Sequence, residues 1–442
     1  MLIVNASIVA ADGIRRDGSV RIAGTDISEV HFGEPLSPRP GEEVFDARGG
    51  LLLPGLIDTH VHFREPGLEE KGSIATESRA ALLGGVSSFV DMPNTKPATL
   101  TPEALDDKYR RAAASSIANY GFFLGASEDT PAILDSIPRR RLACVKLFLG
   151  TTTGAVASPS PKTLDRIFAM CAERNLVVMV HAEDDAIIST NAEAAIARYG
   201  SRELVPIDEH AAIRSREACL RSTGRAVELA LRHGTRLHIA HVSTADEVRE
   251  FLQPGAVEGK QITAETSPMY MDPELWSQPS WRTKINPAVK TGEDAEALRK
   301  AVADGRIDTI GTDHAPHLRG HKAGGALTAA SGAPSIQFAL PVMLEYLAPE
   351  VVVRAMAANP AALFGIDLRG SIKSGVKADL TLVQSLGQLI HDDKVVTPAG
   401  WTPFHRRQVG NSVTDVWVNG VHSLRSGALA AAGAAEELVF GC

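Results

Sequence analysis

Residues 55–67 read GLIDTHVHFREPG, an apolar run that leads into two histidines and an arginine. Side chains alternate between the two faces of an extended strand, so His60 and His62 point the same way. Arg64 continues that face if the strand persists. Two neighbouring imidazoles indicate a metal site, and the nearby arginine indicates an anionic substrate. If this interpretation is correct, other strands must carry the remaining ligands.

The middle of the chain alternates β-type runs with helical patterns. Eight candidate strands occupy residues 55–63, 85–93, 119–127, 143–150, 176–183, 236–243, 261–268 and 308–316. Helical patterns lie between several of them, at 74–85, 162–175, 215–234 and 294–305. This alternation predicts parallel βαβ units, and eight such units predict a closed (β/α)8 barrel. An open doubly wound sheet usually has a glycine-rich phosphate loop after its first strand, and this sequence has none.

The two ends of the chain differ from this middle region. Short β-type runs and turn pairs fill residues 1–53, and strand-like runs return at 378–384 and 413–420, the second closed by Asn-Gly. We therefore predict a small β-sandwich domain built from residues 1–53 and 366–442, with the barrel at 54–365.

Composition excludes several classes of protein. The 442 residues suffice for a barrel and a smaller domain. A net charge of -8 without a basic run argues against a nucleic-acid partner. The sequence lacks the run of about 18 apolar residues that a membrane span needs. The N-terminus has the reverse order of a signal peptide, and the four cysteines lack metal or redox spacing, which together predict a cytoplasmic protein.

Several candidate strands end in residues that can bind a metal, at the strand ends where barrel enzymes hold their catalytic groups. These residues are His60, His62, Lys146, His181, His241 and Asp313. Histidine and carboxylate are standard ligands of zinc and similar ions, whereas a protonated lysine is not. A desolvated lysine has a lowered pKa, and as a neutral amine it can take up CO₂ to become a carbamate that bridges two cations.

We therefore predict two divalent metal ions bridged by carbamylated Lys146. One ion would be held by His60, His62 and Asp313, and the other by His181 and His241. A hydroxide between two such ions is a nucleophile at neutral pH. Asp313 would act as general base and acid, passing a proton to a leaving nitrogen. The predicted chemistry is metal-assisted hydrolysis of an amide, and histidine-rich ligation favours zinc.

Longer motifs resemble the cyclic amidohydrolases, which include dihydroorotases, allantoinases and dihydropyrimidinases (hydantoinases). The resemblance is closest to the dihydroorotases and covers most of residues 50–385. Its motifs are HFREPGLEEKGSIATESRAALLGGVSSFVDMPNTKP (62–97), HAED (181–184), SREAC (215–219), LHIAHVSTADE (237–247), INPAVKT (285–291) and DTIGTDHAPH (308–317). It implies reversible hydrolysis of L-dihydroorotate to N-carbamoyl-L-aspartate, a step of pyrimidine biosynthesis, by an enzyme of the carbamylated-lysine type.

The resemblance also implies a set of substrate contacts. Arginine has a planar fork that suits a carboxylate, so Arg64 is the first candidate to bind the substrate carboxylate. The other implied contacts are Asn94 and His317 to the carboxylate, and Asn286 with the backbone near Gly332 and Ala333 to the ring. The segment 150–162 is a candidate for a loop that closes over the substrate. For the assembly, the resemblance suggests a homodimer.

Three rival functions are less consistent with the sequence. Hydantoinases carry a tyrosine five residues after the bridging lysine, where this chain has Thr151. Allantoinases typically depart from the MPNT motif, which is present here at 92–95. A non-catalytic relative, such as a partner protein of another pyrimidine enzyme, usually loses several ligands, but all six are present. Within the resemblance, these features therefore favour the dihydroorotases.

Overall fold

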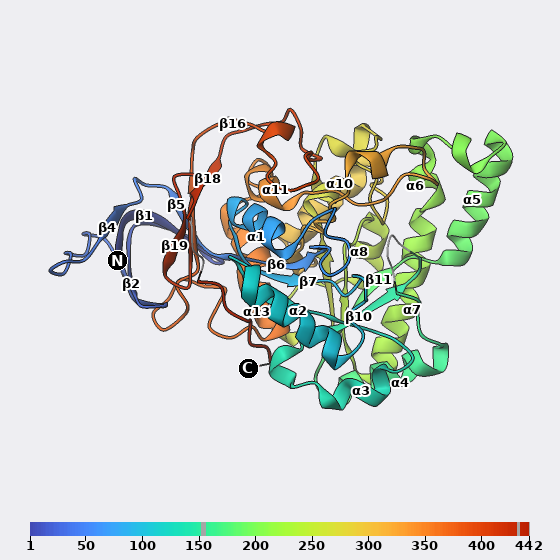
Figure 1. The fold of residues 1–442 in the computed structure, drawn as a ribbon, viewed down its shortest axis with the longest axis horizontal. Helices are drawn as coiled ribbons and strands as arrows, with labels where there is room; N and C mark the ends of the chain where they lie inside the picture. Colours follow the sequence, from blue (N-terminus) through green and yellow to red (C-terminus); the bar gives the residue numbers. More distant parts are fainter. Residues whose placement is uncertain (152–155, 431–433, 442) are drawn as a thin grey trace.

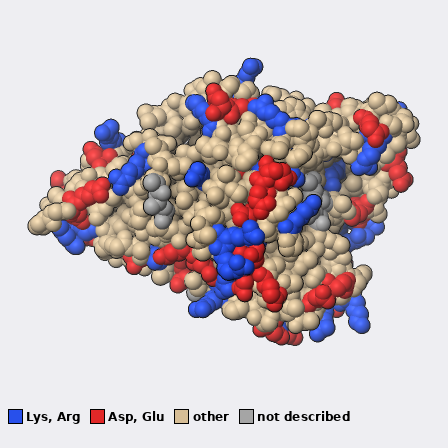
Figure 2. All heavy atoms as spheres, viewed as in Figure 1, with Lys and Arg blue, Asp and Glu red and all other residues tan. Residues whose placement is uncertain are grey.

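A computed structural model describes residues 1–151, 156–430 and 434–441 of the chain. Figure 1 shows two parts, a barrel surrounded by helices and an elongated sheet that carries the N-terminus. The sheet contains strands from both ends of the sequence, blue and red in the picture. Charged side chains of both signs are interspersed on the face drawn in Figure 2. None of the helices in the described part of the chain combines the length and hydropathy needed to cross a bilayer.

The barrel strands pair in parallel in the order in which they occur along the chain. They are β6 (Leu56–Val61), β7 (Val86–Asp91), β8 (Asn119–Phe122), β9 (Leu124–Gly125), β10 (Cys144–Leu149), β11 (Val177–Ala182), β12 (Arg236–Ile239), β13 (Ile262–Thr266) and β14 (Thr309–Ile310). β8 and β9 belong to one predicted run, which is interrupted at Phe123. A parallel bridge between Val61 and His314 joins the first strand to the segment that follows the last one. The predicted (β/α)8 barrel is therefore confirmed.

Helices pack around these strands. The principal ones are α1 (Ile74–Leu83), α2 (Pro102–Ser115), α4 (Pro161–Glu173), α5 (Asp185–Tyr199), α7 (Arg216–His233), α8 (Ala245–Phe251), α10 (Gly292–Ala303), α11 (Ile336–Met343) and α13 (Asn359–Phe364). Several begin at residues whose side chains satisfy the first free N–H groups, such as the capping boxes of Ser73 with Thr76 and Thr291 with Asp294. The barrel strands are buried on both faces, which explains their nearly continuous apolar runs.

One nine-stranded sheet forms the second part of the fold. Its strands are β1 (Leu2–Ala10), β2 (Gly13–Ala23), β3 (Asp26–Phe32), β4 (Val44–Asp46), β5 (Leu51–Pro54), β15 (Leu380–Gln384), β18 (Ser412–Val418), β19 (Val421–Arg425) and β20 (Ala428–Leu429). β5 pairs in parallel with β1 and antiparallel with β15, so it joins the two ends of the sequence. A small β-domain assembled from both termini is confirmed, whereas the boundaries at 53/54 and 365/366 stay a prediction.

Two segments near the C-terminus also contact the barrel. Between the paired short strands β16 (Gln388–Leu389) and β17 (Gln408–Val409), the chain carries the fully buried Trp401. The Trp401 indole donates a 2.8 Å hydrogen bond to the carbonyl of His317. Further on, the Leu438 amide donates to the carbonyl of Tyr120 on β8 at 2.8 Å. The first of these contacts ties a C-terminal segment to a loop of the functional site.

Candidate active site

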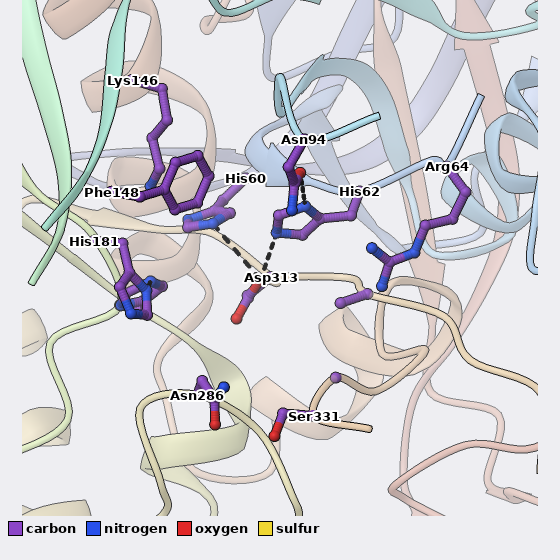
Figure 3. A pocket seen from close by; sticks show the side chains of 13 residues that line it. His60, His62, Arg64, Asn94, Lys146, Phe148, His181, Asn286, Asp313 and Ser331 are labelled. Atoms are coloured by element: carbon purple, nitrogen blue, oxygen red, sulfur yellow. Dashed lines mark hydrogen bonds and ion pairs between the residues drawn. The ribbon is translucent and has the colours of Figure 1, made fainter. Parts of the chain in front are cut away.

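A pocket at the carboxyl ends of the barrel strands brings together most of the predicted residues (Figure 3). It is lined by His60, His62, Arg64, Asn94, Lys146, Phe148, His181, His241, Asn286, Asp313, Ala315, Ser331 and Gly332. All six predicted metal ligands are in this group, together with four of the six predicted substrate contacts. The other two lie behind the wall, where His317 contacts Arg64 and Ala333 forms a bridge to His314.

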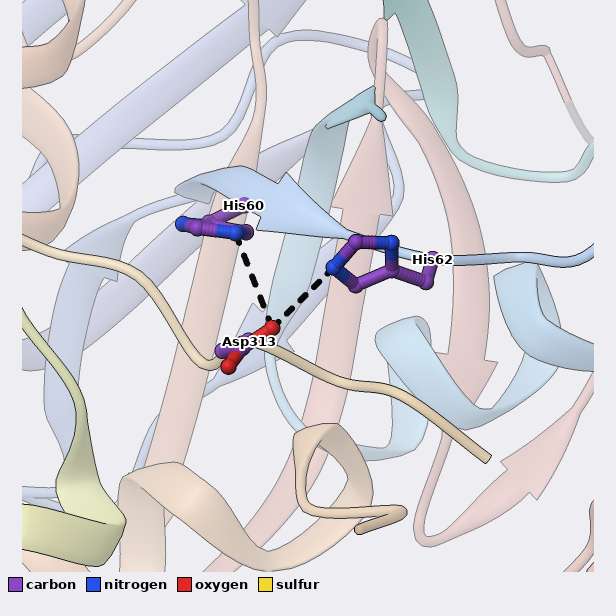
Figure 4. A group of neighbouring side chains, drawn as sticks. All are labelled: His60, His62 and Asp313. Carbon is purple, nitrogen blue, oxygen red and sulfur yellow. Dashed lines mark hydrogen bonds and ion pairs between the residues drawn. The ribbon is translucent and has the colours of Figure 1, made fainter. Parts of the chain in front are cut away.

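Three of the predicted ligands converge on one point (Figure 4). The Oδ1 atom of Asp313 lies 3.1 Å from Nε2 of His62 and 3.6 Å from Nε2 of His60. One potential ligand atom from each residue falls within 4.8 Å of the others. Two imidazoles and a carboxylate in this arrangement can hold a divalent cation.

His181 and His241 form a second pair beside the first group. Nδ1 of His181 lies 2.8 Å from Nε2 of His241, and the two ring centroids are 4.7 Å apart. The His241 ring is also 5.2 Å from the ring of His60. The two sets of nitrogen donors therefore face one shared space, as the predicted division into two ion sites requires.

Neighbouring side chains hold three of these imidazole rings in fixed orientations through hydrogen bonds. Glu265 accepts a 2.5 Å hydrogen bond from Nδ1 of His60, which leaves Nε2 directed at Asp313. Nδ1 of His62 lies 2.7 Å from Oδ1 of Asn94, so this side chain has a contact besides the predicted one to substrate. Such partners fix the tautomer of a ligating imidazole and raise its basicity.

Glu183 plays the same part for His181, and sequence reasoning did not single it out. Its Oε2 lies 2.9 Å from Nε2 of His181, and Arg214 pairs with the same oxygen. The signal was available, because Glu183 follows His181 by two residues in the run 176–183 that is predicted as a strand, and this spacing predicts a shared face. In the structure β11 already ends at Ala182. Glu265 gave a weaker signal, since nothing in the sequence shows that it lies beside His60.

Lys146 is fully buried at the edge of this space. Its Nζ makes no hydrogen bond with any residue that the structure describes, and it lies 5.4 Å from the centre of the Phe148 ring. Burial lowers the pKa of Lys146 below the usual value for lysine, which favours the neutral amine. Burial also raises the pKa of the neighbouring Glu265. A buried lysine nitrogen without a partner is rare in a structural role and fits a chemically modified side chain.

Burial also sets the charge of the ligand groups. It lowers the pKa of His60 to about 3 and depresses the pKa of His62, His181 and His241, so these rings are neutral at pH 7. Neutral imidazole is the form that binds metals. Burial opposes ionisation of Asp313, but in the acid range where this carboxyl titrates, the positive charges of His60, His62 and Lys146 outweigh burial and hold the pKa of Asp313 below its usual value. The site therefore presents neutral nitrogens and an ionised carboxylate.

Three residues that line the pocket have left-handed backbone conformations, at φ 72° for Arg64, 38° for His241 and 48° for Asp313. Residues other than glycine adopt this region at a cost, and such positions concentrate at functional sites. For Arg64 the finding changes the sequence interpretation, because β6 ends at Val61 and the strand does not persist. Arg64 reaches the pocket through a backbone turn instead of the two-residue period of the strand.

Arg64 is buried beside the loop after β14. Its Nε donates to the carbonyl of Pro316 at 3.1 Å, and Nη2 lies 3.3 Å from Nε2 of His317. The same His317 nitrogen lies 3.1 Å from the carbonyl oxygen of Ser331. Burial lowers the pKa of Arg64 to about 10, so the guanidinium remains charged at neutral pH. A buried cation held by neutral groups at the pocket wall can bind an anion.

Gly332 occupies a tight place in the pocket wall beside His317. Its φ is 138°, and a Cβ atom there would lie 2.7 Å from the carbonyl oxygen of Ala315 and 3.0 Å from His317. Only glycine satisfies both the backbone angle and this close approach. The predicted closing loop at 150–162 is described only in part, because residues 152–155 lie outside the described residues. Thr151 does not line the pocket among the described residues, and its hydroxyl donates to Asp185 at 3.0 Å.

Comparison with known proteins places this site in a family. Residues 51–422 match the model of the amidohydrolase family. A dihydroorotase from Halobacterium salinarum is 37% identical over 406 residues, 90% of each chain. A dihydroorotase from Methanosphaera stadtmanae is 30% identical, over 86% of this chain and 87% of that one. Among solved structures, an L-hydantoinase (dihydropyrimidinase) from Arthrobacter aurescens superimposes with a TM-score of 0.87 at 23% identity, covering 99% of both chains. The protein belongs to the amidohydrolase family, as a cyclic amidohydrolase similar to the dihydroorotases.

Proposed function

We propose that this protein is a dihydroorotase, which reversibly hydrolyses L-dihydroorotate to N-carbamoyl-L-aspartate. The observation that carries the proposal is the placement of the buried Arg64 in the same pocket as His60, His62 and Asp313. A cyclic amide that bears a carboxylate needs both a hydrolytic centre and a fixed cation, and this pocket offers both. The curated dihydroorotases at 37% and 30% identity support the same substrate.

The donor set suits two divalent cations, and histidine-rich ligation favours zinc. His60, His62 and Asp313 would hold one, and His181 and His241 the other. The fit rests on neutral imidazoles whose far nitrogens are fixed by Glu265, Asn94 and Glu183. When bound, such ions supply Lewis acidity toward a ring carbonyl and lower the pKa of water.

Lys146 completes this set as a carbamate. Its neutral amine would form an N–C bond to CO₂ with release of one proton, giving an anion with two oxygens. The full burial of Lys146 and the unpartnered Nζ support this modification, because a neutral amine is the reactive form. The new oxygens would face the space that both sets of ligands share.

The remaining residues would bind and orient the substrate. Arg64 would hold the substrate carboxylate through its planar fork, with His317 and Asn94 beside it. Asn286 and the backbone of Gly332 and Ala333 would hold the ring. Asp313, which its lowered pKa leaves ionised at neutral pH, would accept a proton from the attacking water and return it to the leaving ring nitrogen.

Purified protein tests this proposal directly. With metal present, the absorbance of dihydroorotate should fall as the ring opens, chelation should abolish the change, and added zinc should restore it. Hydantoin and allantoin serve as rival substrates in the same assay. Clear turnover of either rival, with none of dihydroorotate, would replace the proposed substrate and leave the family assignment intact.

A further inference from the structure

Lys322 is a buried lysine that lies just outside the pocket, at the end of the turn Arg319–Lys322. Its side chain is 1% exposed. The ammonium donates hydrogen bonds to three carbonyl oxygens, those of Lys284 at 2.8 Å, Ala330 at 3.0 Å and Gly332 at 2.8 Å. A lysine ammonium has three N–H donors, and here each has its own backbone acceptor.

A second buried lysine fastens the same two segments. Lys284 donates to the carbonyl of Ala329 and to the hydroxyl of Ser331, the latter at 3.2 Å. Its own carbonyl accepts from the Gly332 amide at 3.0 Å as well as from Lys322. The segments 284–286 and 329–333 are therefore linked by the main chain and by both ammonium groups.

These two segments form one wall of the pocket. Asn286, which lines the pocket, comes two residues after Lys284. Ser331 and Gly332 also line it, and Lys322 binds the carbonyl of Gly332 and that of Ala330, the residue before Ser331. The Ser331 carbonyl also contacts His317, the neighbour of Arg64. Lys322 thus touches the backbone of the residues that face the substrate, without lining the pocket itself among the described residues.

The charge arrangement distinguishes Lys322 from the structural lysines of this protein. Lys108 is buried against Asp91, and Lys260 pairs with Asp308 at 2.7 Å. Within the described part of the chain, neither Lys322 nor Lys284 forms an ion pair with a carboxylate. A buried charge without a counter-ion is costly to stability. Burial, together with the nearby Lys284 and Arg64, lowers the pKa of Lys322 to about 6. The three carbonyls oppose this shift, because a neutral amine has only two N–H donors and could not hold all three at once.

We propose that Lys322 is a positioning residue of this enzyme, which fixes the segments 284–286 and 329–333 in the geometry that binds the substrate ring. The identity of the ring rests on the proposed function, whereas the link that Lys322 makes between the two segments does not depend on it. Loss of the three hydrogen bonds would leave both segments folded but free to shift. Small displacements of positioning groups cost up to about 100-fold in rate.

Lys322→Met is the first test, since methionine has a similar length and no donor. Hydrogen exchange followed by mass spectrometry should show faster exchange in both segments, without any ligand. Steady-state kinetics with dihydroorotate should show KM raised roughly 10-fold or more with a smaller change in kcat, because substrate binding is lost first. Metal content should equal that of the wild type.

Lys260→Met is the matched control, because it removes a buried lysine near the N-terminal end of β13, away from the pocket. It should lower stability without changing KM or the exchange of the two segments. If Lys322→Met does not fold, Lys284→Met tests the same link from the other side and should shift KM in the same direction.

Unchanged exchange in the two segments, or an unchanged KM, would overturn the inference. Failure of the wild type to open dihydroorotate contradicts the proposed function instead. In that case KM is measured for whichever cyclic amide is hydrolysed, and the exchange experiment stands unaltered.

Discussion

The pocket and the junction between sheet and barrel both bury charged side chains, yet they treat them in opposite ways. At the junction, the Asp379 carboxylate pairs with Arg369. It also accepts hydrogen bonds from the side-chain amide of Asn119 at 3.0 Å and from the backbone amide of Asn419 at 2.7 Å. At the pocket, Nζ of the lining residue Lys146 and one oxygen of Glu265, which lies behind His60, have no hydrogen-bond partner among the described residues.

This difference separates a structural cluster from a functional one. Buried polar groups are almost always satisfied in folded proteins, and an unsatisfied group calls for a specific explanation. The cluster at the junction needs no such explanation, because its residues satisfy each other's charges and hydrogen bonds. The groups at the pocket are left incomplete by the described residues, as expected where a ligand or a modification supplies the missing partners. Substitutions should therefore change turnover at the pocket and stability at the junction.

Lys146→Ala should have the largest effect on turnover. Removing the proposed bridging group should lower bound metal and reduce kcat/KM by about 10³-fold or more, because metal assistance is worth several kcal/mol. Metal analysis and the dihydroorotate assay on the same preparation measure both. If metal content and rate survive the substitution together, Lys146 is a structural lysine after all.

Arg64→Met should have the next largest effect and a different signature. Loss of two charge-assisted hydrogen bonds to the substrate carboxylate should reduce kcat/KM by roughly 10²-fold to 10³-fold. Metal content should stay at the wild-type level, since Arg64 binds none of the proposed ions. A ring substrate without a carboxylate provides the control, because its kcat/KM should fall much less. Equal losses for both rings would remove Arg64 from carboxylate recognition.

Glu265→Gln should have a smaller effect that acts through His60. The amide can still accept from Nδ1 of His60, but it can carry no charge, whereas Glu265 becomes a carboxylate when a nearby cation offsets the burial that raises its pKa. Metal affinity should fall roughly 10-fold to 100-fold, and activity should return at high zinc concentration. A zinc titration of activity measures this shift. Loss of activity that zinc does not restore would place Glu265 in the reaction itself.

The sequence predicted the barrel and the group of residues in the pocket because both depend on local patterns. Parallel strands produce apolar runs, and the positions of these runs with their residue types sufficed to bring His60, Lys146 and Asp313 to one pocket, whereas the role of Lys146 as a ligand stays a prediction. The approach of Arg64 was predicted for the wrong reason, since the chain turns at φ 72° after β6 has ended. Strand periodicity does not extend into a loop.

Long-range contacts were beyond the reach of such patterns. Glu265 is 205 positions from His60, and Trp401 is 84 positions from the His317 carbonyl that it binds. Only the closed fold brings each pair together. Lys322 is a similar case, because a lysine in a polar loop is normally exposed and its burial depends on how the neighbouring loops pack. Local patterns therefore predict the candidate ligands more readily than the residues that orient them.

Asp379→Asn completes the comparison and should have the smallest effect on turnover. The substitution removes the main counter-charge of Arg369, although Glu436 remains 3.5 Å from the same guanidinium. Breaking a buried ion pair from one side leaves an uncompensated charge, so we expect a loss of about 2–4 kcal/mol in the free energy of unfolding. Denaturant unfolding measures this loss, while kcat/KM at 25 °C should stay within about twofold of the wild type, because Asp379 does not line the pocket. A marked fall in kcat/KM of the folded variant would show that the junction positions the site, and the proposed separation between the two buried clusters would then fail.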